Sequence, residues 1–423
     1  MLFYCGRRPE FIAVVATLLS FAAQAQHNTP LTLAEAEDLA LDQEPGHAAL
    51  LARAAAFDEH AVAAGQLPDP TMRIGLANYP ISSGGFSTEG MTQAQLGFRQ
   101  NFPSGKSRSF STRRLESMSD EMAASADARA RDVLTKVRNE WLEAYYWQHA
   151  NGIVTESRPF FSDLVAVTRS LYAVGRKTQH DVLRAELELS RLDDRLIEIN
   201  RRHMQAKAAL SEWLGSAANR PVASNLPAWE QLPVIEELQR NLSSHPALRA
   251  ADAKVDAGHA GVRLAEEHKK PGWALDLGYG YRDGNLPSGD PRSDFVSLSV
   301  TMDLPFFRKN RQDRSLKAAL SERSASEFEK NDLSRRLSSQ LDSEYAHWQD
   351  LGRRLELYES QILSLSESQA QAALLAYQSD VGDFSDVMRG YIDDLNTRLD
   401  HIRLQIERGQ SYTVIANLGG LTR

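Results

Sequence analysis

Hydrophobic and polar residues alternate along four short segments, which is the pattern of a β-strand with one apolar and one polar face. The predicted strands cover residues 70–79, 92–102, 273–283 and 294–304. The third has the clearest alternation, formed by Trp273, Leu275, Leu277, Tyr279 and Tyr281. Each segment has about the ten residues that cross a bilayer at a tilt. Such strands either pack in a soluble sheet or are shared between subunits, because lipid does not tolerate open sheet edges.

A second pattern has apolar residues every three or four positions and predicts long coiled-coil helices. These helices cover residues 106–172, 179–214, 310–378 and 386–418. The first would be ~100 Å long, with Pro159 as its one break signal. One seam of the second is formed by Ala185, Leu192, Ile199, Ala206 and Trp213. The fourth repeats the spacing with Met388, Ile392, Leu395, Leu399, Ile402 and Ile406.

Both patterns occur twice in the same order, which indicates an internal duplication. Residues 26–215 form the first predicted repeat, 216–231 a linker, and 232–423 the second repeat. Each repeat has two strands followed by a helical hairpin. Matching landmarks lie just over two hundred residues apart, as in the pairs Pro103 and Pro305, Val174-Gly175 and Val381-Gly382, and Asp181 and Asp386.

Residues 1–25 indicate a secretory signal peptide, with Arg7 and Arg8 before an apolar stretch and a small-x-small site at 23–25. A buried N-terminal helix is the alternative. Because Arg7, Arg8 and Glu10 together contribute +1, removal of the signal would change the formal net charge from −8 to −9. So acidic a chain is not a general nucleic-acid binder. The one cysteine, Cys5, lies in the signal, so we expect no disulfide, no cysteine-ligated metal and no lipid-anchor cysteine.

No pattern of catalytic or cofactor-binding residues is present in the sequence. It has no Gly-rich phosphate loop, and nothing in the spacing of its Ser, His and Asp residues marks a nucleophile. Met118 and Met122 lie one helical turn apart, but packing explains them better than Cu(I) binding. We therefore expect a protein that is not an enzyme and holds no cofactor or metal.

Taken over the whole mature chain, these features resemble the TolC family of outer-membrane efflux proteins. The most specific motifs are Tyr172-x-x-Gly175 leading into Asp181, and Tyr377 through Gly382 into Asp386. The resemblance implies a mostly α protein with β-structure, whose homotrimer forms one barrel of twelve strands and a periplasmic tunnel of helices. It also implies a passive duct that contacts outer membrane lipid, a periplasmic adaptor (membrane fusion) protein and an inner-membrane RND-type pump.

Several segments resemble the heavy-metal (CusC/CzcC-type) branch of that family, namely residues 67–70, 90–92, 102–106 and 302–307. That branch implies metal cations as cargo, with drugs or secreted peptides as the alternative. The chain departs from some members because it lacks a lipid-anchor cysteine. A structural trimeric coiled-coil protein would explain the heptads, but not two pairs of strands of membrane length.

The resemblance places functional residues in the turns between the long helices. Tyr172, Gly175, Asp181, Tyr377 and Gly382 would form the periplasmic tips and contact the adaptor. Both glycines are expected to adopt a positive φ.

The acidic residues of the second tip are the candidates for the periplasmic entrance. Asp383 and Asp386 of three subunits would form an anionic ring that attracts cations. Alternatively, they are solvated charges and helix N-caps, and Arg389 stands where a second acid would be expected. The first tip is basic, with Arg176 and Lys177. Pro103 and Pro305 would set the bends between strand and helix.

Overall fold

The computed structural model describes residues 29–42, 44–229 and 231–421, so the predicted signal peptide lies outside the described residues. The chain divides into two compact units. Unit 2 consists of Gly46–Asp127 and Pro246–Arg335, and unit 1 of the remaining described residues. Each unit takes segments from both predicted repeats, so neither repeat forms a compact unit by itself.

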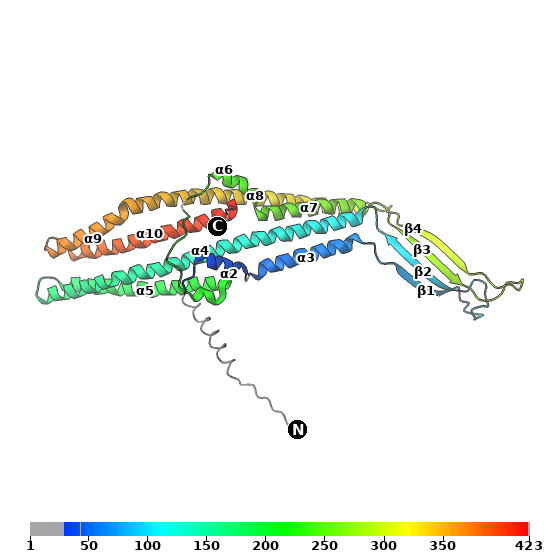
Figure 1. Cartoon of the computed structure of the whole chain (residues 1–423), viewed down its shortest axis with the longest axis horizontal. Coiled ribbons are helices and arrows are strands. Elements are labelled where there is room, and N and C mark those ends of the chain that lie inside the picture. The colour runs from blue at the N-terminus through cyan, green and yellow to red at the C-terminus, as the bar shows by residue number, and fades with distance from the viewer. Residues whose placement is uncertain (1–28, 43, 230, 422–423) are drawn as a thin grey trace, which may run out of the picture. The chain divides into compact units, whose positions relative to one another are not determined.

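Unit 2 contains one antiparallel sheet whose strands follow the order β1-β2-β3-β4 (Figure 1). The strands are β1 (Thr71–Ala77), β2 (Gln93–Phe102), β3 (Trp273–Tyr281) and β4 (Phe295–Met302). The central pair, β2 and β3, joins the two predicted repeats, with Phe98 opposite Leu277. The ladders run without a bulge through β1, β2, β3 and β4.

This continuous register places the apolar residues of all four strands on one face, as the alternation predicts. One row across the sheet is Met72, Phe98, Leu277 and Leu298, and the next is Ile74, Leu96, Tyr279 and Val296. Ile74 and Val296 are each 74% exposed, so none of the described residues covers this face. On the opposite face, Arg99 forms an ion pair with Asp276 at 3.7 Å, and Thr301 donates a hydrogen bond to the same carboxylate.

The helices of unit 2 pack through small residues. Helix α3 (Pro45–Gly65) buries Ala54 and Ala61, whose carbonyl groups accept hydrogen bonds from Ser119 and Thr112 of α4 (Ser107–Ala173). Helix α7 (Pro246–Glu267) approaches α8 (Gln312–Leu357) closely. A Cβ atom on Gly258 of α7 would lie 3.2 Å from the Arg323 Cα atom, so glycine permits this distance.

Unit 1 contains two antiparallel helical hairpins. In the first hairpin, the C-terminal part of α4 is followed by the return helix α5 (Gln179–Leu214). In the second, α8 continues through a π-helical turn (Tyr358–Ile362) into α9 (Leu363–Gln378). The return helix of this hairpin is α10 (Phe384–Gly419). The heptad positions are buried as their spacing predicts, among them Ala185, Leu192, Ile199, Met388, Leu395 and Leu399. These side chains share one core, which therefore holds the two hairpins together.

The long helices have two local features. Helix α4 continues through Pro159 as a single helix, over nearly the range that the sequence predicts. The segment predicted as one α-helix at residues 310–378 instead contains one π-helical turn, Tyr358–Ile362. Among the described residues, no helix is long and apolar enough to cross a membrane.

Residues 216–222 of the segment predicted as a linker pack against the start of the described chain. The segment begins within a 3₁₀ turn (Gly215–Asn219), and Val222 forms a parallel bridge with Leu31. Two short helices of unit 1, α2 (Leu33–Asp42) and α6 (Ile235–Leu242), also bury their apolar faces.

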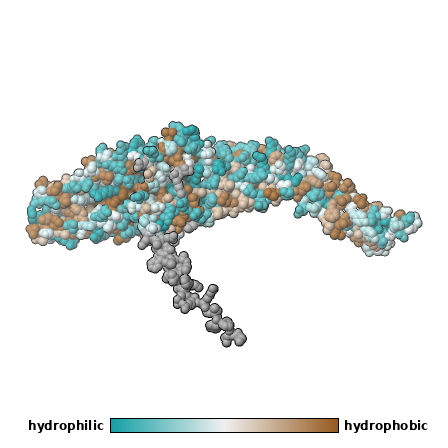
Figure 2. Space-filling view, viewed as in Figure 1, coloured by the Kyte–Doolittle hydropathy of each residue, from teal (hydrophilic) through white to brown (hydrophobic). Residues whose placement is uncertain are grey.

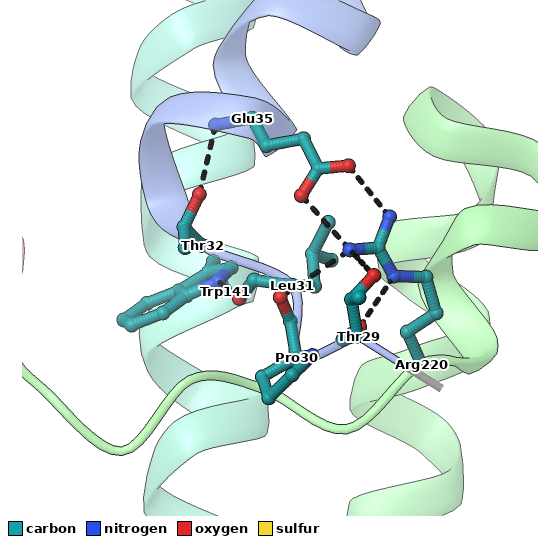
Figure 3. Close-up of polar contacts among 7 residues, drawn as sticks. All are labelled: Thr29, Pro30, Leu31, Thr32, Glu35, Trp141 and Arg220. Carbon is teal, nitrogen blue, oxygen red and sulfur yellow. Dashed lines mark hydrogen bonds and ion pairs between the residues drawn. The ribbon is translucent and has the colours of Figure 1, made fainter. Parts of the chain in front are cut away.

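Arg220 connects this segment to the residues that precede α2 (Figure 3). Its guanidinium donates hydrogen bonds to the carbonyl and hydroxyl oxygens of Thr29, at 2.8 and 2.9 Å, and to both carboxylate oxygens of Glu35. Beside it, the Trp141 indole donates to the Leu31 carbonyl at 3.0 Å (Figure 3). The Arg220 side chain is only 9% exposed, so these bonds replace its water.

We expect Arg220→Ala to lower the free energy of unfolding by about 2 kcal/mol, because hydrogen bonds to a charged group are lost and Glu35 keeps its charge. Arg240→Ala, at an exposed site on α6, is the control. The measurements are thermal unfolding in detergent and limited proteolysis near residue 29. Equal effects of the two substitutions would show that the Arg220 contacts do not hold this segment.

Candidate functional site

The first turn of unit 1 connects α4 to α5 through Gly175. The Gly175 φ angle is +75°, and its amide donates to the Tyr172 carbonyl at 2.9 Å. Thr178 then caps α5 in a reciprocal arrangement: its hydroxyl accepts a hydrogen bond from the Asp181 amide, while the Asp181 carboxylate accepts one from the Thr178 amide. The Tyr-x-x-Gly motif and the following aspartate therefore define the turn and the start of the next helix.

The second turn repeats the backbone hydrogen bond that Gly175 makes in the first, but a different residue makes it. The amide of Asp380 donates to the Tyr377 carbonyl at 3.2 Å, and the Asp380 φ angle is +57°. The positive φ expected for Gly382 was therefore wrong, and Asp380 is the structural counterpart of Gly175. Gly382 is needed for space instead, since a Cβ atom there would lie 2.9 Å from the Ala376 Cβ atom.

The two candidate entrance aspartates lie where α10 begins. Asp383 occupies the N-cap position, but its side chain makes no capping hydrogen bond, unlike Thr178 in the first turn. Asp386 is 59% exposed and lies 3.9 Å from Arg389, which partly compensates its charge. Both carboxylates thus lie at the surface of the turn. Helix capping does not explain why an aspartate occupies position 383, because its side chain makes no capping hydrogen bond.

The basic residues of the first turn interact with the second turn. The Arg176 guanidinium donates a hydrogen bond to the Asp380 carboxylate at 2.5 Å, and the Lys177 ammonium lies 3.7 Å from the same group. Lys177 also lies 4.3 Å from the centre of the Tyr377 ring. Asp380 is therefore compensated, and Asp383 and Asp386 are the second turn's remaining acidic groups. Sequence reasoning missed this pairing, because no local signal connects residues 204 positions apart.

The two tip tyrosines have different surroundings. Tyr377 is 3% exposed and packs against Phe384, whereas Tyr172 is 47% exposed. Burial raises the pKa of the Tyr377 hydroxyl above its ordinary value. Val174 and Val381 are exposed apolar residues beside the turns. Of the tyrosines, Tyr172 is thus the one available to a partner.

The two prolines lie in unit 2, between strand and helix. Pro103 directly follows the last residue of β2, and α4 begins at Ser107. The Lys106 amide in this connection donates to the Glu267 carboxylate at 2.7 Å. Pro305 lies between the end of β4 and the start of α8. Both positions suit proline, which has no amide hydrogen to contribute to a ladder or a helix.

Within the described part of the chain, no group of three His, Cys, Asp or Glu side chains is arranged to hold a metal ion. The turns carry charge, exposed apolar residues and tight backbone geometry. Such an arrangement can attract ions and contact another protein.

Comparison with known proteins finds a family match in the second part of the chain. Residues 238–420 match the model of the family described as outer membrane efflux protein. Protein CyaE of Bordetella pertussis is 26% identical over 336 residues, which are 76% of this chain and 69% of that protein.

The fold is similar to those of solved outer membrane channels. The outer membrane protein VceC of Vibrio cholerae has a TM-score of 0.77 and 18% identity, covering 92% of this chain and 96% of its own. The MtrE outer membrane channel of Neisseria gonorrhoeae has a TM-score of 0.73 and 15% identity, with coverages of 92% and 88%. CusC has a TM-score of 0.79 and 14% identity, and 93% of each chain is covered. The mostly helical fold class with a small sheet is thus confirmed.

The left-handed backbone at Asp380 gives a test of the second turn. We expect Asp380→Asn to change the free energy of unfolding by less than about 1 kcal/mol, because asparagine tolerates this conformation and exposed ion pairs contribute little. Asp380→Val should lower it by about 1–2 kcal/mol more, since a β-branched residue is strained at positive φ. Thermal unfolding in detergent measures both.

Asp393→Val, at an exposed helical position of α10, is the matched control. If it destabilises the protein as much as Asp380→Val does, the effect does not come from the turn geometry.

Proposed function

We propose that the protein is an outer membrane efflux channel of the TolC family and the passive exit duct of a tripartite efflux system. In support, residues 238–420 match the outer membrane efflux protein family, and the chain has the fold of solved outer membrane channels. The proposed location is the outer membrane, with the long helices forming a periplasmic part. The proposed partners are further copies of the chain, a periplasmic adaptor protein and an inner-membrane RND-type pump.

The sheet is the observation that carries this proposal. Its apolar face is exposed from β1 to β4, and each of these edge strands leaves backbone groups without a ladder partner. In lipid such groups are unfavourable, so β1 and β4 need neighbouring strands. Three copies of this sheet, joined edge to edge, would supply those neighbours and close a sheet of twelve strands. The homotrimer that the family relation suggests agrees with this requirement.

The two turns are proposed as the periplasmic end of the duct. Exposed Tyr172, Val174 and Val381 would form the adaptor contact, with Gly175, Asp181, Tyr377 and Gly382 shaping the turns. Asp383 and Asp386 of three subunits would line the entrance. Their support is their exposure and the compensation of Asp380 by Arg176, which leaves these carboxylates as the acidic groups of the second turn.

We propose heavy-metal cations as the cargo, supported by the sequence segments that resemble the heavy-metal branch and by the acidic second turn. Drugs or secreted peptides are the alternative cargo for the same fold. A structural coiled-coil surface protein is less well supported, because it gives no role to the exposed apolar sheet.

The entrance proposal is tested with Asp383→Asn/Asp386→Asn. Removing six carboxylates from a trimer should roughly halve the permeability of cations relative to anions in planar bilayers, because the local potential falls. Asp393→Asn/Asp400→Asn, at exposed positions further along α10, keeps the change in net charge the same. Unchanged selectivity in the first variant would remove these residues from the entrance, and no conductance from the wild type would contradict the duct itself.

The cargo proposal is tested by deleting the gene and comparing tolerance to copper, zinc, cobalt and a panel of antibiotics. We expect tolerance to at least one metal to fall and to return when the wild-type chain is supplied, because a duct is the exit for its pump. Lost antibiotic tolerance with unchanged metal tolerance would overturn metal cations as the cargo.

A further inference from the structure

Two consecutive aromatic residues are exposed in the connection between β4 and α8. Phe306 and Phe307 are 76% and 84% exposed. They follow the end of β4 at Met302, and the Phe306 amide donates to the nearby Leu304 carbonyl at 2.8 Å. Because their ring faces carry much apolar area, water is an unfavourable environment for both. Nothing within unit 2 covers them.

These aromatic residues extend the apolar face of the sheet. Leu304 and Met302 precede them and are 59% and 53% exposed. Trp273 lies opposite Met302 and stacks on Phe102, with ring centres 4.0 Å apart. Figure 2 shows hydrophobic residues gathered over the sheet region of unit 2, to the right of the view. A membrane around this face would therefore reach the β4–α8 connection.

Two exposed cations directly follow the aromatic pair. Arg308 and Lys309 form no ion pair within 4 Å among the described residues. The acidic residues nearest in sequence are Asp303, which forms an ion pair with neither cation, and Asp313, which forms its ion pair with Lys269 at 2.8 Å. Lys269 is also the main reason that the pKa of Asp313 is lowered, with a smaller contribution from Arg308. The junction segment, residues 306–309, thus presents two aromatic rings beside two positive charges without a bound carboxylate.

The corresponding connection of the first repeat lacks this arrangement. Ser104 and Gly105 stand where the second repeat has Phe306 and Phe307. The Lys106 amide binds Glu267, and Arg108 donates to the Gly65 carbonyl at 3.0 Å. The first connection is therefore held by protein contacts, while the second has polar and apolar groups that face outward.

We infer that the junction segment binds an anionic phospholipid at the membrane surface, with Phe306 and Phe307 among the acyl chains and Arg308 and Lys309 at the phosphate. Aromatic side chains favour the boundary between lipid and water, and basic residues beside a membrane attract anionic headgroups. The charge favours lipid over a purely apolar protein partner, which would leave both cations unpaired. This inference rests on the proposed insertion of the sheet into the membrane.

The test uses the full mature chain inserted into vesicles of phosphatidylcholine and phosphatidylglycerol at four to one. The vesicles are dissolved with a polymer that retains the lipid next to the protein, and the two lipids are quantified. Wild type should retain phosphatidylglycerol at roughly twice its vesicle proportion, since each basic residue favours an anionic lipid at its own site by about fivefold while the other retained lipids keep the vesicle composition. R308Q/K309Q should abolish most of that enrichment.

R335Q/R336Q is the matched control, because it removes two adjacent, exposed cations from α8, the helix that follows the junction segment, and should keep the enrichment. In a second measurement, Phe307→Trp should add fluorescence that brominated phosphatidylglycerol quenches. Enrichment that persists in R308Q/K309Q, or a tryptophan at 307 that is shielded by another copy of the chain, would overturn the inference. Failure of the wild type to insert at all would instead contradict the proposed function.

Discussion

The unpaired edges of the four-stranded sheet are the constraint on which the rest of the structure depends. Strands β1 and β4 each have one backbone side without a partner strand among the described residues, and the apolar side chains of all four strands share an exposed face. Such a sheet is unfavourable in water because of its face and in lipid because of its edges. Continuous register from β1 to β4 keeps the apolar side chains on one face along the whole sheet. Lipid around that face and further copies of the chain at the two edges would therefore satisfy both requirements.

The helical part uses duplication in a different way. The two hairpins of unit 1 bury their heptad positions against one another, so that residues such as Leu192 and Met388 belong to the same core. Their turns have the same backbone hydrogen bonds, yet glycine supplies the positive φ at 175 and aspartate at 380. That exchange gives the second turn a carboxylate that can bind Arg176 and Lys177. The two repeats therefore form similar helical hairpins whose turns differ in charge and in contacts.

Much of the fold follows from local patterns, whereas the details of the candidate site do not. Alternation along Trp273–Tyr281 and heptads along Gln179–Leu214 identify a strand and a helix because side-chain spacing reports directly on backbone geometry. The assignment of positive φ to Gly382 failed because glycine also serves where two backbones approach closely. Arg220 was placed in a linker, since no sequence pattern shows that Thr29 and Glu35 lie beside it.

The sequence by itself thus determined the mostly helical class with a small sheet, the apolar face of that sheet and the seams of the hairpins. Only the tertiary structure decided which charges of the turns are compensated, which tyrosine is buried and where the chain leaves aromatic residues uncovered. The physical reason is distance along the chain. Periodicity is set by residues a few positions apart, but the bond between Arg176 and Asp380 forms only when two separate hairpins lie together.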